Sequence, residues 1–575
     1  MPGGLMNLIA EGNQNIILTG NPTKSFFKCT YAKYTNFGLQ KFRIDYDGQR
    51  ILNMNATSNF KFKMPRTGGD LIMDTYLVVK LPTIWSPIIP PDKENPNDNT
   101  VNKWRPYEFK WIKHLGSQMI ERVRFTIGGQ VIQEFTGQYL HNMIERDYDA
   151  NKKELYYKMI GHVPELNDPA NAHDRVNVYP NAYKMDDSSG GPEPSIRSRS
   201  LYIPLNIWFT LASKMAFPIA ALQYNEFHIE VDLRPINELY VIRHIPDTED
   251  PGSYYHQSNL NEAKEQFHRF LHPPPTAGLL DEDFTDTRTN WDTDIHLIST
   301  YAFLSEDEQR VFQLNEQNYL IKQVYTHTYK NVNGSNIIDI ETRGMVSSWM
   351  WFLQRSDIAH RNQWSNYTNW PYDFLPYNVD TANSSYVKKL NYTDDNDWKA
   401  VSQYLTPEYD FDYDSVNKII QQYPSSIMIS GKYYPENQKD IMETWGLLLD
   451  GKYRENTMDA GIFNYVEKYT RTAGNGPDGL YCYNFCLNNN VTDFQPSGAI
   501  NMSKFNKIQF EMGIITPPLD PSSQVDIVCN ADGNMIGIDK TRDSIFDYTY
   551  DLTVMEERYN VLTFSSGNAA LSYAR

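Results

Sequence analysis

The stretch that decides the fold lies near the middle of the chain and reads Phe227-His228-Ile229-Glu230-Val231-Asp232-Leu233. Apolar and polar side chains alternate through it without a fault. Successive side chains of a strand point to opposite faces of a sheet, so this period of two predicts a half-buried antiparallel strand. Its apolar residues are expected to face a core and its polar residues to face water.

The same period of two recurs far from this strand. Residues 121–135 form two alternating runs joined by Gly128-Gly129, and residues 523–538 form two runs joined by Asp532-Gly533. Gly-Gly and Asp-Gly are typical of tight hairpin turns, because the central residues of such turns have positive φ angles. Helical patterning is rare: residues 136–160 predict one or two short helices, and 306–312 predict another helix or turn. The expected fold class is therefore all-β.

The chain of 575 residues is too long for one ordinary domain, whereas two large all-β units fit it. Alternation is lost between about 241 and 290, where three consecutive prolines at 273–275 interrupt a polar segment; this indicates a connection between domains. We expect an arm at 1–24, a first unit at 25–240, the connection at 241–290 and a second unit at 291–575. Many short strands with long polar loops, above all at about 361–453, favour jelly rolls or sandwiches.

Composition argues against several classes of protein. The formal net charge is −18, from 53 Lys and Arg against 71 Asp and Glu. This balance disfavours direct binding of nucleic acid, because phosphate groups need a cationic surface. The longest apolar run, residues 215–222, falls far short of the roughly 20 residues of a transmembrane segment, so none is expected. The first residues lack a secretory signal pattern, and only four cysteines occur, which indicates a reducing compartment.

Motifs that carry catalysis are missing from the sequence. The chain has no GxxxxGK(S/T), HExxH or GxSxG pattern, so we predict no catalytic residue, no cofactor and no metal site. Twelve histidines are scattered singly, too far apart in sequence to indicate a cluster of ligands. His114, His141, His162 and His173 are examples, and each is expected to be a surface or interface residue. The alternating acids of residues 410–414 either attract a cation or form a solvated acidic strand, and the solvated strand is the simpler interpretation.

The N-glycosylation triplet Asn-x-Ser/Thr occurs seven times, and three copies fall in the long loop rich in Asn and Tyr. The candidate acceptors are Asn333, Asn366, Asn383 and Asn391. Such triplets are frequent by chance in an Asn-rich chain, and the missing signal pattern argues against the secretory route. We expect residues 362–396 at the outer end of the second unit, with the Trp364–Trp370 motif ordered by aromatic stacking.

The first 24 residues have only two charged side chains, Glu11 and Lys24. A basic arm would indicate genome packaging, but this one is nearly neutral and mildly apolar. The apolar positions that define a possible assembly arm are Leu8, Ile9, Ile16, Ile17 and Leu18. We expect the arm to dock beneath a neighbouring subunit or against a minor shell protein; the alternative is a frayed terminus without a role.

Several sequence blocks, taken together, point to a family. They are Gly3-Gly4-Leu5 with Leu18–Pro22 and Ser25–Lys28, then Leu201–Leu205 through Pro218–Tyr224 to Arg234-Pro235, then Tyr319–Val324, Pro496–Ser503, and Tyr559–Leu562 with Ser566-Gly567 and Ala570–Tyr573. In this order they resemble the major capsid protein of nucleocytoplasmic large double-stranded DNA viruses. The segment at about 361–453 departs from the family, because compact members need less chain there.

The resemblance implies two consecutive eight-stranded antiparallel jelly rolls in one chain. It further implies a structural, non-enzymatic protein that forms homotrimers, which are pseudo-hexagonal capsomers that tile an icosahedral shell. The implied partners are neighbouring capsomers, minor capsid proteins and penton proteins, in a virion capsid assembled in the host cytoplasm, often over an internal membrane. The alternative from the residues alone is a carbohydrate-binding or glycoside-active β-sandwich protein. Such a protein needs no trimer, so its mass in solution distinguishes the two.

Overall fold

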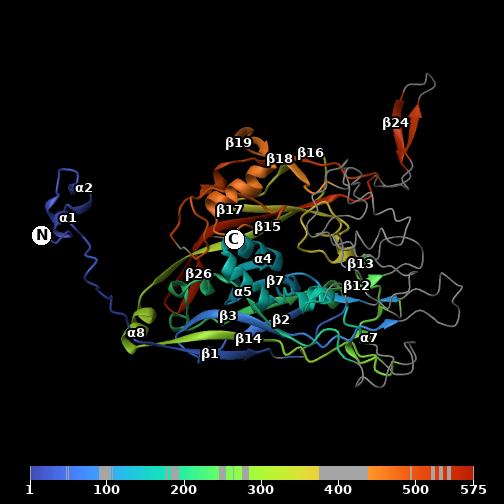
Figure 1. Ribbon diagram of the computed structural model, residues 1–575, viewed down its shortest axis with the longest axis horizontal. Coiled ribbons are helices and arrows are strands. Elements are labelled where there is room, and N and C mark those ends of the chain that lie inside the picture. The colour runs from blue at the N-terminus through green and yellow to red at the C-terminus, as the bar shows by residue number, and fades with distance from the viewer. Residues whose placement is uncertain are drawn as a thin grey trace.

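The structure is a computed structural model. It describes residues 2–46, 48, 51–89, 105–106, 108–175, 179–182, 193–244, 254–262, 265–274, 284–373, 438–492, 495–519, 525–529, 535–540 and 546–573. Every strand pair in these ranges is antiparallel, and the helices are short, so the all-β prediction is confirmed. Two β units lie one above the other in Figure 1, with helices α4 and α5 between them.

The first unit contains two facing sheets. One has the order β1-β14-β3-β10 with β9 on β3, and the other has the order β2-β11-β7-β8. Their bounds are β1 Phe37–Asp45, β2 Ser58–Lys63, β3 Leu71–Lys80, β7 Ile120–Ile127, β8 Gln130–Thr136, β9 Ser200–Pro204, β10 Phe217–Pro218, β11 Phe227–Leu233 and β14 His296–Leu304. Strand β11 is the stretch that decides the fold. It lies between β2 and β7, and its apolar residues are buried as the alternation predicts.

The second unit repeats this arrangement. Its larger sheet has the order β15-β25-β17-β20, with β21 on β17 and β26 on β25, and its smaller sheet has the order β16-β22-β18-β19. The bounds are β15 Gln317–Val332, β16 Ser335–Asp339, β17 Met345–Arg355, β18 Met442–Leu449, β19 Lys452–Asp459, β20 Tyr481–Asn484, β21 Ile500–Asn501, β22 Ile508–Ile514, β25 Tyr550–Ser565 and β26 Asn568–Leu571. Aromatic side chains fill the space between the sheets: Trp351 stacks on Trp445 with ring centroids 4.7 Å apart.

Three small sheets extend the units. They are β13 (Tyr254–His256) with β12 (Tyr240–His244) and β6 (Phe109–Trp111), β4 (Ile88–Ile89) with β5 (Arg105–Pro106), and β23 (Val525–Cys529) with β24 (Met535–Lys540). The predicted hairpin at 523–538 is the β23–β24 pair, which stands away from the body in Figure 1. In the β7–β8 hairpin, both turn residues have positive φ, 55° at Gly128 and 83° at Gly129, as expected for a tight turn.

The predicted helical segment at 136–160 is confirmed as two helices. Thr136 caps α4 (Gly137–Asp147) by accepting a hydrogen bond from the Tyr139 amide, and Asp149 caps α5 (Ala150–Ile160) by accepting one from the Lys152 amide. The other α-helices of the described residues are α1 Leu5–Ile9, α2 Ile16–Thr19, α3 Leu115–Met119, α6 Pro164–Asn167, α7 His268–Leu271, α8 Glu306–Leu314 and α10 Glu467–Arg471. No helix among the described residues has both the length and the apolar character needed to cross a bilayer.

The unit boundary differs from the one expected at residue 291. Strand β14, predicted to open the second unit, instead lies between β1 and β3 and completes the first sheet. Part of the segment expected as a connection also packs into the first unit, because β12 pairs with β6. A local pattern shows that a strand exists, but the partner of that strand depends on residues about 250 positions away.

The apolar core of the first unit continues into the second. One buried cluster runs from Ile44 to Ala569 and includes residues of both units, and a second cluster lies within the second unit. At the join, the ring centroids of Trp208 and Tyr319 are 5.3 Å apart, and those of Phe217 and Phe564 are 5.5 Å apart. The two units therefore meet through a shared core rather than through two separate surfaces.

Candidate functional site at the junction of the two units

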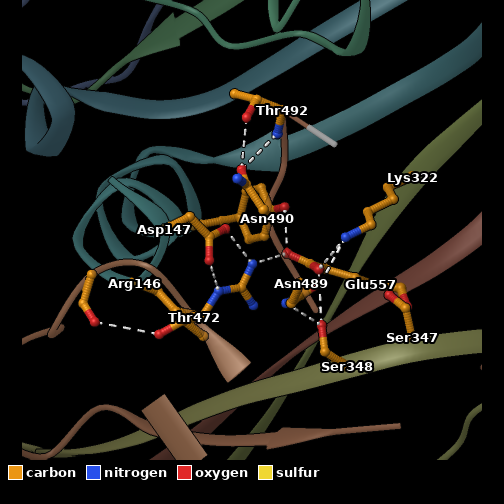
Figure 2. Close-up of polar contacts among 12 residues, drawn as sticks. Arg146, Asp147, Lys322, Ser347, Ser348, Thr472, Asn489, Asn490, Thr492 and Glu557 are labelled. Carbon is orange, nitrogen blue, oxygen red and sulfur yellow. Dashed lines mark hydrogen bonds and ion pairs between the residues drawn. The ribbon is translucent and has the colours of Figure 1, made fainter. Parts of the chain in front are cut away.

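The join carries a buried charged cluster, which we call the junction cluster: Arg146, Asp147, Lys322 and Glu557. Arg146 ends α4 with Asp147, and its Nη2 lies 2.7 Å from Asp147 Oδ2 and 2.7 Å from Glu557 Oε1 of β25. The side chains of Arg146, Asp147 and Glu557 are fully buried. Figure 2 shows the guanidinium between the two carboxylates, one from each unit. An ion pair thus joins the first unit to the second where water is excluded.

Glu557 is the most connected member of the junction cluster. Its carboxylate accepts hydrogen bonds from Ser348 Oγ at 2.8 Å and from Tyr139 Oη at 2.9 Å, and Lys322 Nζ lies 3.5 Å away. Burial alone would raise the pKa of Glu557, but Arg146 and Lys322 hold that pKa well below its usual range. Burial raises the pKa of Asp147 although Arg146 faces it. The charges of the cluster balance, two cations against two carboxylates.

A loop of the second unit closes over the end of α4. The Gly474 amide donates to the Arg146 carbonyl at 2.8 Å, and the Gly476 amide donates to the Glu145 carbonyl at 2.8 Å. A Cβ atom on Gly474 would lie 2.6 Å from each of these two carbonyl oxygens, so only glycine fits this approach. The last turn of α4 is therefore held by backbone as well as by charge.

A second segment crosses the junction at residues 362–370. Asn362 Nδ2 donates to the carbonyls of Asn237 and Tyr240, both at 2.8 Å. Tyr367 Oη donates to Asn142 Oδ1 at 2.8 Å, and its ring stacks on Phe352 with centroids 4.1 Å apart. The expected aromatic stacking is present, but this part of the loop is buried instead of lying at an outer end. Asn side chains that bond to backbone carbonyls make such burial possible.

Two of the four candidate glycan acceptors lie among the described residues. Asn333 is half-buried at the turn between β15 and β16. Asn366 is 5% exposed; its Nδ2 donates to the Trp370 carbonyl, and its Oδ1 accepts from the Thr368 amide and hydroxyl. The folded subunit therefore does not present the Asn366 amide to a solvent-borne enzyme. Asn383, Asn391 and the alternating acids at 410–414 lie outside the described residues.

The possible assembly arm is exposed at every described position except Asn15, which is half-buried. Its apolar positions are between 66% and 89% exposed: Leu8, Ile9, Ile16, Ile17 and Leu18. The backbone hydrogen bonds of α1 and α2 stay within the arm, which runs away from the body in Figure 1. The exposed stretch continues past residue 24 with further aromatic residues: Phe26, Phe27, Tyr31 and Tyr34. This apolar surface extends to the start of β1.

The histidines are not all scattered in space. The ring centroid of His114 lies 4.3 Å from that of His141 and 3.9 Å from that of His162, whereas His173 is exposed. The prediction that these side chains form no cluster is wrong for three of the four. The one signal in the sequence was the spacing of His141 and Glu145, four residues apart in a segment predicted to be helical.

Comparison with known families covers most of the chain. The family model described as "Major capsid protein N-terminus" matches residues 25–261, and "Large eukaryotic DNA virus major capsid protein" matches residues 308–570. The chain is 24% identical to the major capsid protein of Chrysochromulina ericina virus over an alignment of 642 residues that covers 100% of both chains. It is 23% identical to that of Paramecium bursaria Chlorella virus 1 over 575 residues, again with 100% of both covered.

Solved structures share the fold. The PBCV-1 virus capsid chain superposes with a TM-score of 0.56 at 18% identity, covering 96% of this chain and 100% of that one. The Faustovirus major capsid protein gives a TM-score of 0.57 at 12% identity, covering 96% and 94%. The fold is the double jelly roll of capsid proteins, and the structural role is favoured over the carbohydrate-active alternative. The chain belongs to the major capsid protein family of large eukaryotic DNA viruses, a family of structural and not catalytic proteins.

Proposed function

We propose that three copies of this chain form a pseudo-hexagonal capsomer, and that capsomers tile an icosahedral shell. The observation that carries the proposal is the junction, where a shared core and the buried junction cluster join the two jelly rolls. Each chain then presents two similar jelly rolls in a fixed relative orientation. Three chains related by a threefold axis therefore present six similar outer edges. A hinged pair of rolls would not present such a regular outline.

We also propose that the apolar arm is covered in the particle, on the inner side of the shell. Exposed apolar side chains in such number invite aggregation, so a partner that covers them is required at the copy number of a shell. Burying one Leu or Ile contributes about 1.5–3 kcal/mol, against a backbone ordering cost of about 1–2 kcal/mol per residue. The arm therefore orders when a neighbouring capsomer, a minor capsid protein or a penton protein covers it. Assembly in the host cytoplasm belongs to the same proposal.

The trimer is tested by light scattering coupled to size-exclusion chromatography on the purified full chain. The expected mass is about three times 66.8 kDa at micromolar concentration. A stable monomer with no larger species would contradict the capsomer.

The arm is tested separately by deleting residues 2–24. We expect the shortened chain to form the same trimer with an almost unchanged melting temperature, because the arm buries no residue against the body. Shell assembly in the presence of the other virion proteins should fail. Normal particles from the shortened chain would mean that the arm is passive, and loss of the trimer would place the arm in the subunit interface instead.

A further inference from the structure

Three potential metal ligands from the helical insert of the first jelly roll lie together. His114 precedes α3, while His141 and Glu145 occupy the same face of α4, one turn apart. One ring nitrogen of each histidine and one carboxylate oxygen of Glu145 all lie within 4.8 Å of one another. His114 has φ 53° and ψ 38°, a left-handed conformation that is uncommon outside glycine, and this conformation places its ring beside that of His141.

Two nitrogen atoms of this cluster are buried without a hydrogen-bond partner among the described residues. They are Nδ1 of His114 and Nδ1 of His141, and His141 as a whole is only 1% exposed. A buried polar atom without a partner costs about 1–3 kcal/mol, so native proteins rarely leave one without a reason. Two such nitrogens on adjacent rings are acceptors that no described residue of the chain satisfies.

The residue types of the cluster suit a cation, because imidazole nitrogens and carboxylate oxygens are common metal ligands. Glu145 accepts a hydrogen bond from Tyr157 Oη at 2.5 Å and lies 3.4 Å from Lys153 Nζ, which orients the carboxylate.

We propose that His114, His141 and Glu145 bind one divalent transition-metal ion of the zinc class, with water at the remaining position. Two imidazoles and one carboxylate suit Zn²⁺ and its neighbours in the first transition row, whereas Mg²⁺ and Ca²⁺ prefer oxygen ligands. Tetrahedral zinc needs bonds of about 2.0–2.1 Å, so the ligand atoms must close by at most about 1.5 Å. Rotation of the side chains supplies a movement of that size.

His162 supports the site without being a ligand. Its ring is stacked on that of His114 with an interplanar angle of 14°, and two parallel stacked rings cannot both hold one ion in their planes. Its Nδ1 accepts the backbone N–H of His114 at 3.3 Å and lies 3.0 Å from Asn167 Nδ2. His162 thus fixes the position of His114.

The site adjoins the junction of the two rolls. The Glu145 carbonyl accepts the Gly476 amide, and Lys153, beside the Glu145 carboxylate, also bonds to Asn475 of the same loop. An ion bound at Glu145 would therefore hold α3 and α4 in the position that this loop of the second roll contacts. Metal binding should stabilise the whole subunit, because an ion that binds the native state alone raises the stability of that state.

The experiment titrates the chelator-treated full chain with Zn²⁺ by calorimetry and measures the bound metal by mass spectrometry. We expect one ion per chain, a higher melting temperature with Zn²⁺, and no equivalent effect of Mg²⁺. Co²⁺ in place of Zn²⁺ should give the visible absorption of a low-coordinate nitrogen and oxygen site, a signal that is independent of stability.

Three variants remove the ligands singly: His114→Asn, His141→Gln and Glu145→Gln. Asn is chosen at 114 because it tolerates the left-handed backbone. Each variant should weaken Zn²⁺ binding at least about tenfold, the loss that even an outer partner of a ligand produces. The matched control is His228→Gln on β11, a histidine outside the cluster, which should bind Zn²⁺ like the unaltered chain.

Two results would overturn the proposal. One is the lack of stoichiometric Zn²⁺ binding by the unaltered chain at micromolar concentration, which would leave a water molecule as the partner of the two nitrogens. The other is Zn²⁺ binding that persists unchanged in both Glu145→Gln and His141→Gln. Neither result would affect the trimer, which is measured separately by mass.

Discussion

Arg146 shows how a single buried side chain holds two jelly rolls together. Taking charges out of water is costly, so a buried pair is stable only while its charges are matched. Replacing Arg146 by Met would leave Asp147 and Glu557 facing each other with only Lys322 nearby. We expect Arg146→Met to lower the free energy of unfolding by about 3–5 kcal/mol, measured by denaturant titration.

The control for this prediction is Arg43→Met. Arg43 also lies between two carboxylates, those of Asp45 and Asp294, but its side chain is 43% exposed. An exposed pair contributes at most about 1 kcal/mol, so this variant should unfold almost like the parent. Equal losses in the two variants would mean that burial does not decide the energy of these pairs.

Asp357 gives a prediction for acid pH. Burial alone would raise its pKa, but Arg355 at 2.7 Å and Arg361 at 2.9 Å lower the pKa to about 2. A folded pKa below the unfolded value of about 3.9 stabilises the native state fully above pH 4, and that contribution is lost as the pH falls towards 2. It amounts to about 2 kcal/mol.

The variant Asp357→Asn should therefore unfold more easily than the parent at neutral pH and approach it in acid. The measurement is the difference in free energy of unfolding between the two proteins at pH 6, 4 and 3. A difference that stays constant over this range would show that the carboxylate does not titrate as its ion pairs require. Asp478→Asn, which breaks an exposed pair with Lys439, is the matched control.

Residue patterns predicted strand faces well and polar burial poorly. In β11 the alternation predicted the buried apolar side chains correctly, because burial of a strand face follows from a period of two, but Asp232, expected to face water, is buried and pairs with Arg122. In β25 the acids Glu556 and Glu557 look like a solvated pair, yet both are buried. Glu556 bonds to Trp349 and Arg558, and Glu557 to Arg146. Trp349 and Arg146 are distant in sequence, and Arg558, two residues from Glu556, looks like an ordinary surface charge. No local pattern therefore indicates that the two acids are buried.

At the scale of elements, the loop at 472–476 and the end of α4 approach each other closely at the junction. Gly474→Ala would place a Cβ 2.6 Å from the carbonyl oxygens of Glu145 and Arg146 and push the loop away. We expect a loss of about 1–3 kcal/mol in the free energy of unfolding, the usual cost of overpacking. Gly38→Ala on β1, where a Cβ meets nothing within 4 Å, should cost far less. Equal stability of the two variants would contradict the close approach.

The pairing of strands and the packing of distant segments were harder to predict than the helices and strands themselves. The helices at 136–160 and the turn at Gly128-Gly129 were predictable because caps and turns are local. Neither the pairing of β14 with β1 nor the histidine cluster was predictable from the sequence, because both form only when distant segments meet. The buried segment at 362–370 was expected at the surface because its Asn-rich composition looks like a loop. Its side chains satisfy backbone groups of the other roll instead.

At the scale of the whole molecule, the two rolls are one mechanical unit. The sequence predicted two all-β units joined by a connection, and separate cores would follow from that picture. The second roll does have an apolar cluster of its own, but the cluster of the first roll also enters the second, and its member Tyr139 bonds to Glu557 of the junction cluster. A subunit of this kind keeps its outline when neighbours push against it, which is what a shell requires.

This shared core predicts that the two rolls unfold together. Chains of this length commonly unfold domain by domain, and the second roll has a core cluster of its own that includes β22, but the shared cluster and the buried ion pair at the junction tie the two rolls together. Hydrogen exchange measured against denaturant should show β11 of the first roll and β22 of the second losing protection at the same concentration. In Arg146→Met the junction is weakened, and the two strands should then lose protection at different concentrations. If β11 and β22 already lose protection at different denaturant concentrations in the parent protein, the rolls are independent domains. The regular six-edged outline of the capsomer must then come from contacts between subunits rather than from the junction within each subunit.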